Sequence, residues 1–127
     1  MQELNLPLKS DERPNENRTL TVIHGVTLEP RPRVLTLVVL ENHCSLTTPA
    51  ELTRLLVSKR NGEQGEEEIK DVRAANDTHE QGCWNGILNV SSVDGGVAFY
   101  IHSGHGIAIP WKMTADDLDR LLNLLEK

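Results

Sequence analysis

Apolar and polar residues alternate early in the chain, which is the pattern of a half-buried β-strand. In residues 19–28 the even-numbered positions are apolar except for His24, and several residues are β-branched. Residues 29–33 contain two prolines. Because proline cannot donate to a strand ladder, this segment is predicted to be a turn or loop. Residues 34–40 are then almost wholly apolar, as in a central strand that is covered on both faces. The two segments predict a hairpin.

Two later segments carry the signals of amphipathic helices. The first is predicted to begin at Thr48, with Pro49 at the first helical position, and to end at Asn61. The second is predicted to begin at Thr114, and its leucines recur three, four and seven residues apart: Leu118, Leu121, Leu122 and Leu125. We expect this apolar stripe to dock on the sheet or, in part, on a partner.

The last third of the chain predicts a three-stranded meander. Residues 84–93 and 97–102 have strand character, and the Asp-Gly-Gly sequence at 94–96 is a tight hairpin signal. Alternation over residues 107–111 predicts the third strand, and Pro110 indicates an edge position for it.

Two regions have weaker patterns. Residues 1–17 are predicted to form a flexible tail, because their second half is polar and has no period. The alternation of Leu4, Leu6 and Leu8 leaves a short edge strand as the minor alternative. Within residues 66–75, the spacing of Ile69 and Val72 suits a helical turn, but an exposed edge strand is favoured.

Together these elements predict an α+β fold in residues 18–127, in the order β-β-α-(β)-β-β-β-α. The hairpin and the meander would form one antiparallel sheet of about five strands, with two amphipathic helices packed on it. A chain of 127 residues has the usual size of a single domain. It is also long enough to bury a core without staples.

The charge and the low aromatic content exclude several classes of function. The net charge is −6, which has the wrong sign for direct binding to phosphate backbones. Aromatic residues make up only 3% of the chain, too few for a stacking platform for single-stranded nucleic acid. No apolar run approaches the roughly 20 residues that a membrane span requires. We therefore expect neither nucleic-acid binding nor membrane insertion.

The cysteines and the N-terminus suggest a cellular compartment. Cys44 and Cys83 show no framework spacing, so we expect two thiols that stay reduced. The N-terminal residues lack the apolar segment of a signal peptide. A cytoplasmic location follows from both expectations.

Histidines provide the main candidates for chemistry. His102 and His105 lie three residues apart across a glycine turn, and His24 is a candidate third metal ligand. Zinc usually requires three or four protein ligands, and no recognised spacing joins these residues. His24 is more simply explained as a core or interface histidine with a local hydrogen-bond partner. Cys83 lacks the local signature of a catalytic cysteine. No cofactor is predicted, and a non-enzymatic role is favoured.

The leading hypothesis is a non-enzymatic interaction or regulatory accessory protein that acts through a sheet edge or the final leucine helix. Its partner would be another protein or a second copy in a homodimer. The candidate contact residues are Trp111, Leu118, Leu122, Glu66, Glu67 and Glu68. The glutamates could equally form a solvated face, and for Trp111 we favour a structural role that seals the sheet against the last helix.

Two alternatives from other classes remain. One is a small metal- or cysteine-dependent enzyme that uses His102 and His105. The other is a small-ligand-binding domain in which Trp84 and Tyr100 line a pocket between the sheet and the helices.

Overall fold

A computed structural model of the chain describes residues 1–27, 34–41, 43–70, 87–102 and 108–127. These residues form two helices and two antiparallel sheets of four strands, which confirms the predicted α+β class. In chain order the elements are β1 (Gln2–Leu8), β2 (Arg18–Val26), β3 (Leu35–Leu40), β4 (His43–Thr47), α1 (Pro49–Arg60), β5 (Glu66–Glu68), β6 (Ile87–Val93), β7 (Gly96–His102), β8 (Trp111–Met113) and α2 (Ala115–Leu125).

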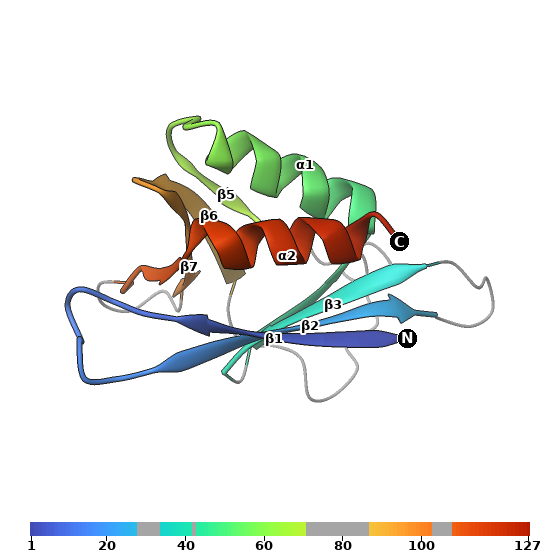
Figure 1. The fold of residues 1–127 in the computed structure, drawn as a ribbon, viewed down its shortest axis with the longest axis horizontal. Helices are drawn as coiled ribbons and strands as arrows, with labels where there is room; N and C mark the ends of the chain where they lie inside the picture. Colours follow the sequence, from blue (N-terminus) through green and yellow to red (C-terminus); the bar gives the residue numbers. More distant parts are fainter. Residues whose placement is uncertain (28–33, 42, 71–86, 103–107) are drawn as a thin grey trace.

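The strands form an N-terminal sheet, ordered β1-β2-β3-β4, and a C-terminal sheet, ordered β5-β6-β7-β8. The two sheets meet where the end of β1 lies beside β8. There, Lys9 and Lys112 exchange two main-chain hydrogen bonds of 3.1 and 2.7 Å. Both helices lie on the same side of strands β1 to β3, and the two chain ends lie at the same end of the molecule (Figure 1).

The core lies between the helices and the apolar faces of both sheets. Each helix contributes its leucine stripe, and the strands contribute aliphatic side chains and Phe99. Fully burying one such side chain stabilises the fold by about 1.5–3 kcal/mol. The prediction that the second leucine stripe docks on the sheet is confirmed, because all four of its members are buried: Leu118, Leu121, Leu122 and Leu125.

Both helices begin where the sequence predicts. The Thr48 hydroxyl accepts a hydrogen bond of 3.2 Å from the Glu51 N–H. The Thr114 hydroxyl accepts one of 3.2 Å from the Asp117 N–H. Each threonine thereby satisfies an N–H group that has no partner within its helix.

The N-terminal tail is the first prediction that the structure overturns. Residues Gln2–Leu8 form β1, so the minor alternative of an edge strand is right and the tail prediction is wrong for these residues. β1 pairs with β2 in register, with Leu6 opposite Leu20. Leu6 and Leu8 have no exposed area. Burial of this leucine row explains why the segment is ordered although the residues after it are polar.

The single five-stranded sheet is also corrected, to two sheets of four strands. Besides β1, the sequence interpretation missed β4, which pairs with β3 and carries only one aliphatic side chain, Leu46. The third meander strand begins at Trp111, residues 108–110 before it are not part of a strand, and residue 107 of the predicted segment lies outside the described residues. The weakly predicted strand falls on the acidic run itself, as β5, and Ile69 extends its pairing with a 2.8 Å bond to the Leu88 carbonyl.

The cysteine prediction is wrong for Cys44, which is disulfide-bonded and buried in β4. The other cysteine of the chain, Cys83, lies outside the described residues. Within the described ranges, no helix is both long enough and apolar enough to cross a membrane.

Candidate functional site

The predicted contact residues of the leucine helix point into the protein. Leu118 is fully buried and Leu122 is 8% exposed, and both belong to the core together with residues of the two sheets. The outward positions of α2 carry polar and charged side chains, such as Asp116 and Arg120. The apolar stripe of α2 therefore forms part of the core.

Trp111 is likewise part of the core, and an arginine covers its ring. Its side chain is 6% exposed, and the guanidinium carbon of Arg18 lies 4.6 Å from the ring centroid. This is the geometry of a cation–π contact. Because Arg18 begins β2 and Trp111 begins β8, the contact joins the two sheets. Its position agrees with the structural role that the sequence favours for Trp111.

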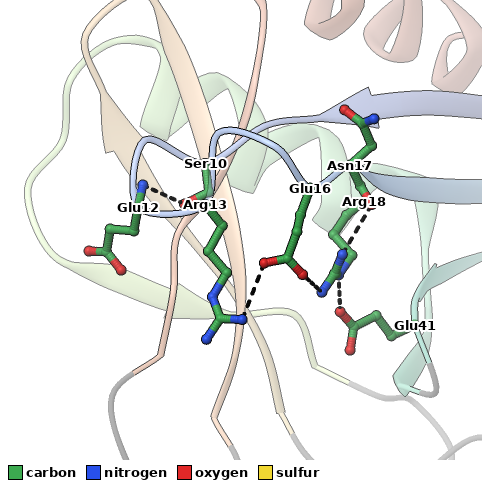
Figure 2. A network of polar contacts seen from close by, with 7 residues as sticks. All are labelled: Ser10, Glu12, Arg13, Glu16, Asn17, Arg18 and Glu41. Carbon is green, nitrogen blue, oxygen red and sulfur yellow. Dashed lines mark hydrogen bonds and ion pairs between the residues drawn. The ribbon is translucent and has the colours of Figure 1, made fainter.

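The arginine that covers Trp111 is bound by two carboxylates, those of Glu16 and Glu41 (Figure 2). Arg18 donates to Glu41 and to Glu16, and Glu16 also accepts from Arg13 at 3.2 Å. The two arginines lower the pKa of the Glu16 carboxyl, and the Glu41 carboxylate raises the pKa of Arg18. The network links residues 13–18, at the end of the loop between β1 and β2, to Glu41 after β3.

The acidic run forms an edge strand, and two of its glutamates have partners inside the protein. Glu66 accepts a hydrogen bond from the Tyr100 hydroxyl. Glu67 lies 3.5 Å from the ammonium of Lys59 and 3.7 Å from Arg54. The side chain of Lys59 is only 2% exposed, and its ammonium is also 3.5 Å from the main-chain oxygen of Glu63.

His24 has the structural role that the sequence favours. It is 6% exposed, its Nδ1 lies 3.0 Å from the Thr36 hydroxyl, and its Nε2 lies 3.5 Å from the Lys127 main-chain oxygen. The contact holds the end of the chain beside β2.

The structure leaves the metal hypothesis untested. The side chain of His102 is not described, and His105 lies outside the described ranges, as do Cys83 and Trp84. Among the side chains that the structure does describe, no group of three or more His, Cys, Asp or Glu residues is arranged to hold a metal ion.

The outer edge of β1 is the candidate site, because part of its main chain faces away from β2. Lys9 directs its N–H and C=O groups toward Lys112 in β8. These groups alternate in direction along a strand, so Pro7, Asn5 and Glu3 direct theirs outward and the even-numbered residues bond to β2. Within the described part of the chain, no main-chain bond joins these three outward positions to another strand.

A cavity of about 240 Å³ opens where β1 and β8 separate. Pro7 lines it from β1 and Lys9 from the position just after that strand; Lys112 and Met113 line it from β8, and Asp94 lines it from the turn between β6 and β7. The cavity adjoins the outward edge of β1. The contact between the edge and the cavity is at Pro7.

Sequence reasoning missed this site because it assigned the segment to a tail. One signal was present: Pro7 lies between Leu6 and Leu8, at a position whose main chain points away from β2. Its missing N–H therefore removes no hydrogen bond to β2. No protein-family model, curated protein or solved structure matches the chain.

Proposed function

We propose that the chain is a non-enzymatic interaction protein that pairs the outer edge of β1 with an extended segment of a partner protein. The supporting observation is the outward direction of the main-chain groups of Glu3 and Asn5. An unpaired strand edge is a template for an added strand, and the main-chain hydrogen bonds supply much of the affinity. The sequence suggested two surfaces, a sheet edge and the leucine helix. The apolar face of the leucine helix is buried in the core.

The side chains that flank this edge define the chemistry of the partner. Leu4 is partly buried against the core, so the added strand gains from an apolar residue beside it. Glu3 is exposed on the opposite face, where a lysine or arginine on the added strand would form a cross-strand charge pair. The net charge of −6 also favours approach by a basic segment. The expected partner segment therefore alternates apolar and basic residues.

A second copy of the chain is the competing occupant of the edge. In an antiparallel two-fold arrangement, Leu4 of each copy would face its counterpart, and each Glu3 would face an Asn5. This arrangement places no like charges opposite each other, so it is compatible with the homodimer predicted from the sequence. The homodimer is therefore one of the outcomes that the experiment must distinguish.

The proposal requires no cofactor. The predicted cytoplasmic location loses the support of the cysteines, because Cys44 is disulfide-bonded and disulfides are typical of oxidising compartments.

The test compares the wild-type chain with Glu3→Pro and with the matched control Glu3→Ala in quantitative affinity capture. Both variants lack the carboxylate, but only Glu3→Pro lacks the outward N–H. The hydrogen bonds to β2 come from even-numbered residues and remain in both variants. We expect Glu3→Pro to capture the partner segment at least about tenfold less than Glu3→Ala does.

Two further measurements complete the test. Light scattering over a range of concentrations identifies the second copy as the occupant if the mass doubles and Glu3→Pro abolishes the doubling. Hydrogen exchange of the Glu3 and Asn5 amides should slow when the occupant binds. Equal capture by Glu3→Pro and Glu3→Ala would contradict the proposal. So would a strictly monomeric chain that captures no partner.

A further inference from the structure

The chain contains three Asn-X-Ser/Thr triplets, the acceptor sequence for N-linked glycans. They begin at Asn17, Asn76 and Asn89, and none has proline in the middle position, which would prevent modification. Such a short triplet also arises by chance, so its exposure and its compartment decide whether it is used. Asn76 lies outside the described residues, which leaves Asn17 and Asn89 for comparison.

The two described triplets differ in burial. Asn89 is 5% exposed and lies in the middle of a sheet, where it pairs with Glu68 of β5 and with Tyr100 of β7. A glycan is bulky and belongs on a surface, so it does not fit on a side chain buried in this sheet. Asn17, in contrast, is exposed and lies in the loop between β1 and β2. Exposure therefore separates Asn17 from Asn89.

The amide of Asn17 is accessible. Figure 2 shows the Asn17 side chain pointing away from the carboxylates of Glu16 and Glu41. Its main-chain oxygen accepts a 3.1 Å hydrogen bond from Arg18, but its side-chain amide has no hydrogen-bond partner among the described residues. Thr19, the third residue of the triplet, is also exposed. Both side chains that define the acceptor are thus open to solvent.

The disulfide of Cys44 is an independent observation, and it concerns the compartment. Structural disulfides form in oxidising compartments such as the lumen of the endoplasmic reticulum. N-linked glycans are typical of proteins that pass through that lumen. A chain that gains its disulfide there also meets the transferase that modifies exposed triplets.

We propose that Asn17 carries an N-linked glycan. The donor is an oligosaccharide linked to a lipid diphosphate. The side-chain nitrogen of Asn17 forms a bond to the anomeric carbon of the sugar, and the bond between that carbon and the diphosphate oxygen breaks. The lipid diphosphate leaves with the electron pair of that bond, and the nitrogen gives one proton to a base of the transferase. The site shares no residue with the β1 edge, so either proposal can fail alone.

The first test uses the wild-type chain, purified from the cells that naturally produce it and alkylated before lysis. A peptide N-glycosidase converts a glycosylated asparagine to aspartate, and mass spectrometry locates the change by comparison with a sample without the enzyme. We expect conversion at Asn17 and none at Asn89. An unmodified Asn17 would overturn the proposal. Recovery of Cys44 as an alkylated free thiol would also overturn it, because the chain would then come from a reducing compartment.

The second test uses variants of the full chain directed into the secretory pathway of cultured eukaryotic cells. Thr19→Ala should lose the glycan, whereas Thr19→Ser should keep it because the hydroxyl of the triplet remains. Ser91→Ala is the matched control: it destroys the triplet at Asn89 and should leave the mass of the glycosylated chain otherwise unchanged. A glycan that persisted in Thr19→Ala, or that disappeared in Ser91→Ala, would overturn the assignment to Asn17.

Discussion

β1 and β5 each lie at the edge of a four-stranded sheet, but they use their side chains in opposite ways. β1 has seven residues; its inward leucines join the core, and of its outward positions Pro7 lines a cavity. β5 has three residues, all glutamates, and two of them bind side chains of the protein itself. Both strands are acidic in part, yet only β1 combines a long edge with a flanking apolar side chain.

The comparison shows that charge in the sequence does not identify the edge that is open to a partner. A short, charged strand resists pairing with other chains, so the three glutamates of β5 protect their edge. β1 lacks that protection over residues 2–6, and Pro7 limits its outward donors at one end only.

The largest effect should come from Leu6→Ala in β1. Leu6 is fully buried in the core, so its truncation should lower the free energy of unfolding by about 2–5 kcal/mol in a urea titration. The control Gln2→Ala changes an exposed residue of the same strand and should stay within about 0.5 kcal/mol of wild type. If Leu6→Ala proved as neutral as its control, β1 would not belong to the core.

The next largest effect should come from Lys59→Met, which removes the ammonium that holds β5. The main-chain oxygens of Glu63 and Gln64 and the carboxylate of Glu67 would lose this partner, while the aliphatic packing would remain. We expect a loss of about 1–3 kcal/mol in the free energy of unfolding. Lys70→Met, at an exposed position, is the matched control, and an equal loss in both variants would contradict the anchoring role.

Tyr100→Phe should have a smaller effect, about 1 kcal/mol at neutral pH, because it removes the hydrogen bond to Glu66. The direction in which alkaline pH changes the free energy of unfolding also follows from the pKa of Tyr100. The folded pKa of Tyr100 is raised, so the stability linked to its protonated form is complete below the unfolded pKa and is lost as the pH rises above it. Unfolding measured across alkaline pH should therefore depend less on pH in Tyr100→Phe. A wild-type slope that the variant retained would assign the effect to another group.

The smallest effect should come from Arg54→Gln, at an exposed position of α1 beside Glu67 of β5. Arg54 binds Glu51 at 2.8 Å and lowers the pKa of that carboxyl. The linked stability is complete above the unfolded pKa and is lost as the pH falls, so the pH dependence that it causes is confined to acid. Carboxyl NMR should show the Glu51 pKa rising toward its ordinary value in Arg54→Gln. An unchanged titration would show that the ion pair does not persist in solution.

The local sequence was sufficient to determine several elements of the fold. Thr48 and Thr114 were identifiable as helix starts because a cap and the N–H group that it satisfies are three residues apart. The strands β2, β3, β6 and β7 followed from alternation or from continuous apolar runs. The burial of His24 followed from its place on an apolar strand face.

Only the tertiary structure decided which surfaces remain available. It joined Arg18 to Trp111, Lys59 to Glu67 and Glu66 to Tyr100, pairs that lie far apart or on different elements and share no sequence pattern. It also turned the predicted tail into β1, because the leucines of that segment gain burial only when β2 and the helices are in place. Long-range packing assigns each apolar stripe and each charge to a partner, and residue order alone does not contain that assignment.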